Sequence, residues 1–363
     1  MNTSLTSNKS QEFADKINPL LESIKDEKVH KIVESFWKND VVPYFTFLHT
    51  LSENLVNKSI GYDEATKETI RSTREVLEKG DRVDEAINDK NLMKKLKTIF
   101  RIVGAPYGLT SNAVRHALEK PGGYPGDYDL LEFIYNNVPT SELFGYCADM
   151  AFLNDDYARA VRSRKDMMKR IFRNYFKQQT GKKSLSILNI ACGASRDLRE
   201  LFAEPGFSLP VTTRFVLIDK SQEALDFSKK KLSPFPANSE FVFYQHSVYD
   251  YLKESEKYHE ILKGQDLIYS IGLADYIPAD ALKAQILFFF NLLNKGGHLI
   301  IAHKDSKNYH PVTPDWWADW SFHLRNEQEV VDLFTSSGIQ NYSLSVERET
   351  DTNIIFSVDI IKQ

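Results

Sequence analysis

The chain has 363 residues, which predicts two domains or one large decorated domain, and its 42% apolar and 26% charged residues are typical of a soluble globular protein. Its net charge of −4 gives no electrostatic reason to expect nucleic acid or an anionic membrane as a partner. The two cysteines, Cys147 and Cys192, are too few for a disulfide framework or a zinc site, so we expect no metal.

The ends and the apolar runs of the chain predict neither a signal peptide nor a membrane span. The first residues lack a basic segment followed by an apolar core. The longest apolar run, AQILFFFNLL, is about half of the ~20 residues that cross a bilayer. We therefore expect a reduced, cytoplasmic protein.

The first 180 residues predict a helical cap or substrate domain. Residues 1–12 are polar and are expected to be disordered. Apolar residues three and four apart predict helices across residues 13–117 and again across residues 157–179. Between them, EKPGGYPGDYDLLEFIY interrupts the helical pattern, and Asp127 or Asp129 in it is a candidate N-cap for the next helix.

From residue 181 to the C-terminus the pattern changes to short apolar strands that alternate with helices. Such strands are typical of a parallel sheet that is buried on both faces, and QNYSLSVERETDTNIIFSVDII predicts a closing antiparallel hairpin. The fold class expected for this domain is α/β, with a seven-stranded, doubly wound, Rossmann-like sheet. The expected parallel strands are residues 186–191, 214–219, 240–245, 266–271 and 297–303.

The corner after the first strand, ACGAS, restricts the ligand. A pyrophosphate at this place requires three glycines in the pattern G-x-G-x-x-G, but only Gly193 is present, and a P-loop sequence is absent as well. A nucleoside without phosphates needs only one close approach to the backbone. S-adenosylmethionine is such a ligand, and a nicotinamide oxidoreductase is excluded.

The ends of the strands supply the expected cofactor residues. Asp219 can accept hydrogen bonds from both ribose hydroxyls, although it could also cap the following helix. Ser247 and the backbone after it lie where adenine would be met, although Ser247 could equally be a cap, and the backbone of Ser270 and Gly272 would line the methionine end. The full expected set is Ala191, Gly193, Asp219, Lys220, Ser247, Val248, Ser270, Gly272 and Arg164, with Arg164 reaching the cofactor carboxylate.

Together these motifs make the chain similar to class I S-adenosylmethionine-dependent methyltransferases. Within that class the chain resembles the bacterial family linked to biosynthesis of an extracellular factor, 3-hydroxypalmitic acid methyl ester. The stretches that carry the narrower resemblance are GGYPGDYDLLEFIY, ILNIACGASRDLREL, DLIYSIGLADYIP and WADWSFHLRNEQEV. The resemblance implies a helical region packed over the core and methylation of an oxygen, plausibly a carboxylate, of a small, fatty-acid-like acceptor.

The same resemblance matches residues one by one. Gly193 and Asp219 match cofactor positions, Tyr124 and Asp127 match a Gly-Tyr-x-Gly-Asp-Tyr loop, and Arg325 matches an arginine after the tryptophan segment. The chain departs from the expected Gly-Asn pattern after the fifth strand, where it reads Ala-His-Lys, and this departure lies near the acceptor.

Candidates for the chemistry remain open between functional and structural alternatives. Methyl transfer is an in-line displacement, so a carboxylate acceptor needs no base, whereas a hydroxyl or amine would need one, for which His303 is the candidate. Tyr124 and Asp127 are expected at the cofactor or acceptor, with a helix cap as the alternative for Asp127. The expected substrate residues, each with a structural alternative as core, cap or ion-pair residue, are Asp275, Tyr276, Trp317, Trp320 and Arg325.

The leading function is an O-methyltransferase that acts on a small molecule. The alternatives are an N-methyltransferase that acts on an amine or a protein side chain, and a non-catalytic S-adenosylmethionine-binding protein. SIGLADY after the fourth strand lacks the Asn/Asp-Pro-Pro-Tyr run of enzymes that methylate planar amide or base nitrogens, which argues against that chemistry. The expected partner is a small molecule, with no nucleic acid and no membrane span, and the oligomeric state stays open, with a homodimer as one option.

Overall fold

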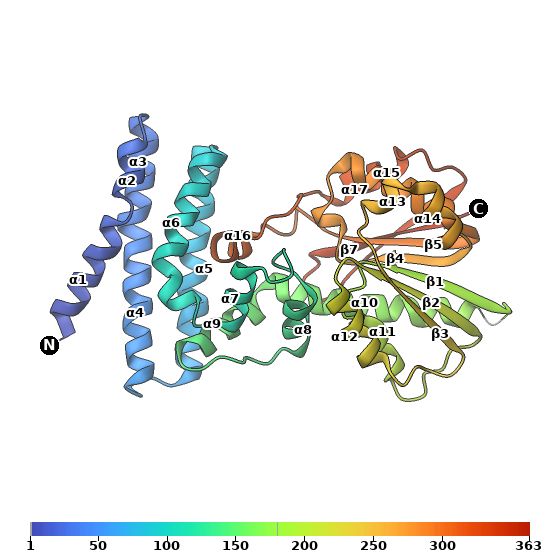
Figure 1. Ribbon diagram of the computed structural model, residues 1–363. Helices are drawn as coiled ribbons and strands as arrows, with labels where there is room; N and C mark the ends of the chain where they lie inside the picture. Colours follow the sequence, from blue (N-terminus) through green and yellow to red (C-terminus); the bar gives the residue numbers. More distant parts are fainter. Residues whose placement is uncertain (1, 180) are drawn as a thin grey trace. The chain divides into compact units, whose positions relative to one another are not determined.

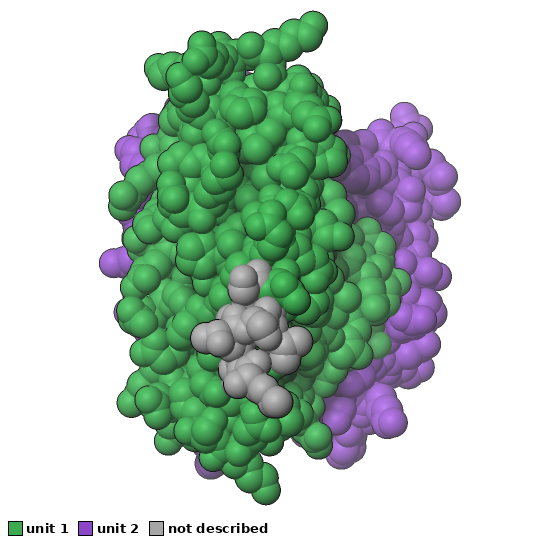
Figure 2. Space-filling view, turned by 90° about the vertical axis from the view of Figure 1, so that its left-hand side faces the viewer, with its two compact units in different colours: residues 1–155, 311–321 green, residues 156–310, 322–363 purple. Residues whose placement is uncertain are grey.

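The computed structural model describes residues 2–179 and 181–363 (Figure 1). The chain divides into two compact units, coloured separately in Figure 2. Unit 1 comprises residues 1–155 and 311–321, and unit 2 comprises residues 156–310 and 322–363. The boundary expected from the sequence lies at residue 180, whereas this division places residues 156–180 in unit 2 and residues 311–321 in unit 1.

Unit 1 is helical. Polar side chains begin several of its helices: Asp26 accepts backbone N–H groups of α3, Asp89 those of α6, and Ser111 that of α7. The elements of unit 1 are α1 (Asn2–Asp15), α2 (Asn18–Ser23), α3 (Glu27–Phe36), the π-helical η1 (Trp37–Val41), α4 (Val42–Val56), α5 (Tyr62–Ile87), α6 (Lys90–Gly108), α7 (Asn112–Glu119), α8 (Tyr128–Asn136), α9 (Phe144–Asn154) and α16 (Val312–Ala318).

The first dozen residues differ from the expected disorder, because α1 includes them. Phe13, near the end of this helix, is buried and its ring lies 6.0 Å from that of Phe45 in α4. Trp37 donates its indole N–H to the Phe13 carbonyl at 2.9 Å. An apolar anchor therefore holds a helix whose polar sequence would not stabilise it alone.

Two tryptophans explain why α16 belongs to unit 1. Three glycines leave room for their rings: a Cβ added at Gly80 would lie 2.6 Å from Trp316, and one at Gly104 or Gly108 would lie 2.8 or 2.7 Å from Trp317. The Phe100 ring contacts both, with centroids 5.1 and 5.2 Å away. These close approaches bury both indoles in the helical core.

Unit 2 holds a seven-stranded sheet of order β3-β2-β1-β4-β5-β7-β6, in which β7 runs antiparallel to β5 and β6, as the sequence predicts. Helices cover both faces, with α10, α11 and α12 on one and α13, α14, α15 and α17 on the other (Figure 1). The strands are β1 (Ser184–Ile190), β2 (Thr212–Asp219), β3 (Ser239–Gln245), β4 (Gln265–Ser270), β5 (Leu293–Lys304), β6 (Tyr342–Arg348) and β7 (Ile355–Lys362). The helical elements are α10 (Asp156–Gln178), α11 (Arg196–Phe202), α12 (Gln222–Leu232), α13 (Asp250–Lys253), α14 (Ser255–Leu262), the 3₁₀-helical η2 (Ala274–Tyr276), α15 (Ala279–Leu292) and α17 (Glu327–Thr335).

Helix α10 belongs to unit 2 because its apolar face packs on the sheet. Met168, Phe172 and Phe176 of α10 are buried in one core with residues of β1 and β2. Periodicity alone cannot assign this face to the sheet, because it predicts only that α10 has an apolar side. Among the described residues, no helix is both long and apolar enough to cross a membrane.

We expect Gly104→Ala to lower the free energy of unfolding by about 1–3 kcal/mol, because the new methyl group overpacks Trp317. This loss should exceed the gain of about 1 kcal/mol in helix propensity. Gly181→Ala is the control, because a Cβ there meets nothing within 4 Å. Urea unfolding of both variants measures the difference, and equal stability of the two would contradict the packing argument.

Candidate functional site

The corner after β1 has an unusual backbone. Ala191, Gly193 and Ser195 have φ values of +55°, +51° and +48°, a left-handed conformation that is free of strain only for glycine. Cys192 donates its N–H to the Ile218 carbonyl at 2.9 Å, which ties the corner to β2. Two residues with side chains, Ala191 and Ser195, thus hold backbone conformations that glycine adopts more readily.

Asp219 holds this corner from the end of β2. Its Oδ2 accepts the Gly193 N–H at 2.8 Å, and its Oδ1 accepts the Ser221 N–H at 2.9 Å. The cap of α12 is Ser221, whose hydroxyl accepts the Ala224 N–H, so the alternative of Asp219 as the N-cap is wrong. Burial raises the pKa of Asp219, which is 5% exposed. Each carboxylate oxygen keeps a further lone pair for a ligand hydroxyl.

The ends of the neighbouring strands lie beside this corner. Register pairs Ile190 with Ile218 and Asp219 with Gln245, so β1, β2 and β3 finish at one edge of the sheet. Ser270, the last residue of β4, donates its hydroxyl to the Ile190 carbonyl at 3.0 Å. The strand order reverses between β1 and β4, which is where open α/β sheets bind ligands.

The remaining expected cofactor residues lie at the same edge. Ser247 and Val248 follow β3 and are half-buried, and the Ser247 hydroxyl accepts the Tyr249 N–H at 3.3 Å. Lys220 is exposed. Arg164 of α10 is 3% exposed, and its Nη1 and Nη2 atoms lie 3.6 Å from where a Cβ on Gly272 would be. Cofactor binding by these residues stays a prediction, and their positions in the structure are compatible with it.

The ends of β4 and β5 carry a buried ion pair. Lys304, the last residue of β5, places its Nζ 2.5 Å from Oδ2 of Asp275, and its backbone N–H donates to Oδ1 at 3.0 Å. Burial lowers the pKa of Lys304 to about 8. Burial by itself would raise the pKa of Asp275, but the Lys304 charge outweighs it and holds that pKa well below its usual value. Asp275 is thus a partner of Lys304 rather than a helix cap.

Aromatic rings surround the Lys304 ammonium group. Its Nζ lies 3.7 Å from the centroid of Phe322, 4.9 Å from that of Tyr157 and 5.8 Å from that of Tyr276. Rings at these distances stabilise a cation by their faces. Tyr276, expected at the acceptor, therefore lies in the wall around a charged nitrogen.

His303 has both ring nitrogens bonded inside the protein. Nδ1 lies 2.7 Å from the Lys304 carbonyl oxygen, and Nε2 lies 3.2 Å from Nη1 of Arg325. These partners require a proton on Nδ1 and a lone pair on Nε2, and burial lowers the pKa of His303, so the ring is neutral. Both ring nitrogens thus have partners inside the protein in this arrangement, and a function of His303 as general base stays a prediction.

Arg325 is neither a surface ion pair nor open to a ligand in this arrangement. It is 8% exposed, and its Nη2 donates to the Ile277 carbonyl at 2.7 Å and its Nη1 to that of Ala274 at 3.3 Å. Both acceptors flank Asp275 and Tyr276. Arg325 thus holds the η2 segment, and binding of the acceptor by Arg325 stays a prediction.

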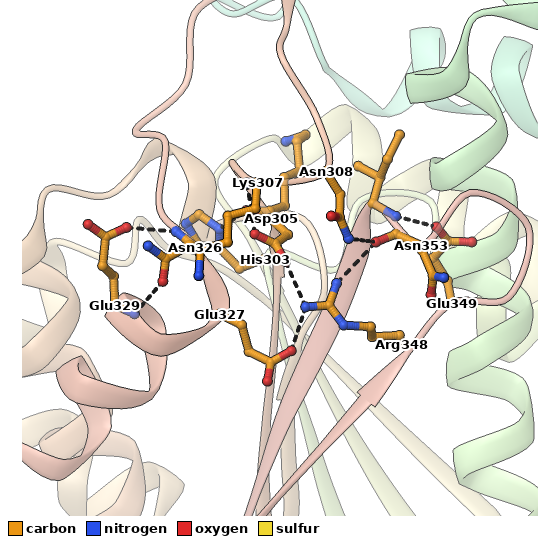
Figure 3. Close-up of polar contacts among 12 residues, drawn as sticks. His303, Asp305, Lys307, Asn308, Asn326, Glu327, Glu329, Arg348, Glu349 and Asn353 are labelled. Atoms are coloured by element: carbon orange, nitrogen blue, oxygen red, sulfur yellow. Dashed lines mark hydrogen bonds and ion pairs between the residues drawn. The ribbon is translucent and has the colours of Figure 1, made fainter.

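A polar network fixes the chain just beyond this cluster (Figure 3). Arg348 of β6 donates Nη2 to Asp305 Oδ2 at 2.6 Å and to Glu327 Oε2 at 2.5 Å. Its Nη1 and the side-chain amide of Asn308 both donate to the Asn353 carbonyl. The network therefore connects the end of β5, the start of α17 and the β6–β7 turn.

Asp127 in unit 1 takes the structural alternative. It caps α8: Oδ1 accepts the Leu130 N–H at 3.0 Å and lies 2.7 Å from His116 Nε2, while Oδ2 accepts the Gly122 N–H at 3.2 Å. Tyr124, in the same loop, is half-buried. Catalytic functions for Asp127 and Tyr124 stay predictions.

The tryptophan segment also takes its structural alternative. Trp317 is buried in the core of unit 1, as described above. Helix α16 ends at Ala318, and Asp319 has a left-handed φ of +49°, so Trp316 and Trp320 do not share a helical face as expected. An acceptor wall built from Trp317 and Trp320 finds no support in this packing.

Sequence reasoning missed the pairing of Lys304 with Asp275 and the buried Asp197 of α11. The available signal for the ion pair was the presence of charged residues at the ends of apolar parallel strands. Asp197 lies two residues after the corner, but nothing in the local sequence indicates that its side chain is buried.

Within residues 2–179 and 181–363, no group of three or more His, Cys, Asp or Glu side chains could hold a metal ion.

We expect Ala191→Gly to raise the free energy of unfolding by up to about 1 kcal/mol, because glycine relieves the left-handed strain and this outweighs its entropic cost. Ala194→Gly is the matched control: Ala194 is buried without a positive φ, so it should lose about 1 kcal/mol. Thermal unfolding checks both, and equal losses would show that Ala191 is not strained.

Comparisons with known proteins agree with this fold. The family described as "Methyltransferase domain" matches residues 181–350. No curated protein is similar enough in sequence to match. A solved structure described as a possible exported protein from Bordetella parapertussis is 15% identical, covering 69% of this chain and 86% of its own, with a TM-score of 0.51. At this identity the likeness shows the fold alone.

Two further structures are less similar, with TM-scores below 0.5, and nothing about this protein is inferred from them. Magnesium protoporphyrin IX methyltransferase from Synechocystis PCC 6803, with bound SAM, has a TM-score of 0.41 and 9% identity over 58% of this chain and 85% of its own. The N-methyltransferase NodS from Bradyrhizobium japonicum WM9, with S-adenosyl-L-homocysteine, has a TM-score of 0.40 and 14% identity over 65% and 97%. The matched methyltransferase domain contains β1 to β6, with the one-glycine corner and Asp219 inside it. We conclude that residues 181–350 form a methyltransferase domain.

Proposed function

We propose that the enzyme transfers the methyl group to a carboxylate oxygen of a small, fatty-acid-like acceptor. The observation that carries this proposal is the buried Lys304 ammonium group, which lies among aromatic rings at the ends of β4 and β5. A cation favours an anionic head group, and the rings favour an apolar chain. The resemblance to the 3-hydroxypalmitic acid methyl ester family supports the same acceptor class.

The charges of this cluster favour an anion. Lys304 is a cation below a pH of about 8, and Asp275 neutralises one charge. Arg325 adds a second buried cation whose hydrogen bonds go to two carbonyls and to neutral His303. Asp275 is the buried carboxylate beside these two cations, and the other carboxylate that acts on Arg325, Glu329, is exposed, so an acceptor carboxylate would compensate the buried positive charge.

The chemistry of a carboxylate acceptor fits the absence of an available nitrogen on His303. A carboxylate is already ionised, so no proton must leave before the displacement. When bound, S-adenosylmethionine supplies an electrophilic methyl group on a sulfonium. The protein then has to hold the acceptor oxygen in line and exclude water, which accounts for most of the rate in such reactions.

In this proposal the corner after β1 and the residues at the neighbouring strand ends hold the cofactor. Asp219 accepts the ribose hydroxyls, Ser247 and the Val248 N–H meet adenine, and Arg164 beside Gly272 takes the cofactor carboxylate. Gly193 permits the close approach of the nucleoside to the backbone. The alternative function is N-methylation of an amine, which would leave the positive cluster without an anionic partner.

We expect Asp219→Ala to lose about 2–4 kcal/mol of S-adenosylhomocysteine binding, because it removes a charged hydrogen-bond acceptor. Calorimetry measures the loss of affinity. The control is Asp266→Asn, a carboxylate at the start of β4, away from the carboxyl ends of the strands. Because burial raises the pKa of Asp219, wild-type affinity should fall with acid at a higher pH than an ordinary aspartate would give. Unchanged affinity in Asp219→Ala would remove Asp219 from the cofactor site.

We expect the KM for 3-hydroxypalmitate or palmitate to be constant below a pH of about 8 and to rise above it, because deprotonation removes the Lys304 charge. The double variant Lys304→Met/Asp275→Leu removes both charges together, so it should fold, yet its KM should rise by about tenfold or more. Methyl transfer from radiolabelled cofactor measures both. Transfer to amines but not to these acids would support N-methylation instead.

A further inference from the structure

Asp197, in the first turn of α11, is a buried carboxylate with an unsatisfied oxygen. It is 5% exposed, and among the described residues its Oδ2 has no hydrogen-bond partner. Burying an ionised carboxylate without full pairing is costly, so proteins normally pair such a group. The unsatisfied oxygen is therefore a candidate acceptor for a ligand donor.

The other side of the carboxyl group is supported from the sheet. The Tyr269 hydroxyl of β4 hydrogen-bonds to Asp197, and it also accepts the Asn189 side-chain N–H of β1 at 2.6 Å. Tyr269 and Asn189 are both buried. The Tyr269 hydroxyl thus holds the carboxyl group on the side of the sheet and leaves Oδ2 without a hydrogen bond.

The position of Asp197 is the ligand-binding position of the fold. It follows Ser195 of the corner by two residues and lies in the first turn of α11. The Arg164 charge acts on Asp197, and the Arg164 guanidinium group lies beside Gly272, just after β4. An acidic and a basic side chain thus lie together at the point between β1 and β4 where the strand order reverses.

We propose that Asp197 accepts the α-ammonium group of S-adenosylmethionine, while Arg164 takes its α-carboxylate, so that the two side chains together recognise the zwitterionic end of the cofactor. An ammonium group supplies up to three donors, which is what an unsatisfied carboxylate oxygen requires. This assignment depends on the cofactor and not on the acceptor proposed above.

The consequence is selectivity for the amino-acid end of the ligand. 5′-Methylthioadenosine shares the nucleoside and the thioether with S-adenosylhomocysteine but lacks the amino acid, so it cannot use Asp197. Burial raises the pKa of free Asp197, and a bound ammonium group would lower it again. Binding of S-adenosylhomocysteine near that pKa should then release a proton.

The test is calorimetry of wild type and Asp197→Asn with both ligands, in buffers of different ionisation enthalpy. Asparagine keeps the shape of the side chain and removes the charge, so the melting temperature should be unchanged or higher. S-adenosylhomocysteine should bind at least about tenfold more weakly, since charged hydrogen bonds contribute about 1.5–3 kcal/mol. Affinity for 5′-methylthioadenosine should stay the same, and the proton release should disappear.

Three outcomes would overturn the proposal or separate it from other failures. Unchanged S-adenosylhomocysteine affinity in Asp197→Asn would overturn it, and so would an equal loss for both ligands, which would indicate a disturbed corner. The control Asp266→Asn, a carboxylate at the start of β4 that accepts the Ser186 N–H at 2.9 Å, should bind both ligands as wild type does. Wild type that binds S-adenosylhomocysteine but methylates no fatty acid would contradict the acceptor proposal and leave Asp197 untouched.

Discussion

The Asp219 carboxylate is the constraint on which the ligand-binding edge depends. Its two oxygens bind one N–H from the corner after β1 and one from the start of α12. These bonds hold the corner in a path that Ala191 and Ser195 follow with left-handed φ values. Strained backbone conformations are kept only where surrounding contacts hold them. Without the hydrogen bonds of Asp219, we expect the corner to relax and to lose the shape proposed for nucleoside binding.

Buried charged side chains lie along this edge of unit 2, with Arg164 near Asp197 and Asp275 paired with Lys304. Carboxylates with pKa values raised by burial, Asp219 and Asp197, lie near β1 and β2. Cations with pKa values lowered by burial, Lys304 and Arg325, lie near β5. The first pair suits a ligand with hydroxyl and ammonium donors, and the second suits an anion.

Much of the fold follows from local sequence. Apolar β-branched runs predict the strands, and the polar breaks between them predict the helices, because a parallel strand that is buried on both faces needs a continuous apolar stretch. The single glycine and the aspartate at the next strand end predict the nucleoside site, because both are set by position along the chain. The position of α10 in unit 2 and of α16 in unit 1 could not be predicted, because each depends on which surface its apolar face meets.

The sequence by itself determined the fold class, the one-glycine corner and Asp219, since these depend on periodicity and on residues next to strand ends. Only the tertiary structure decided that Lys304 pairs with Asp275 and that Trp317 lies in a helical core. It also decided that the two ring nitrogens of His303 hydrogen-bond to the Lys304 carbonyl and to Arg325. The physical reason is burial: the state and partners of a polar side chain depend on residues distant in sequence, which local patterns do not encode.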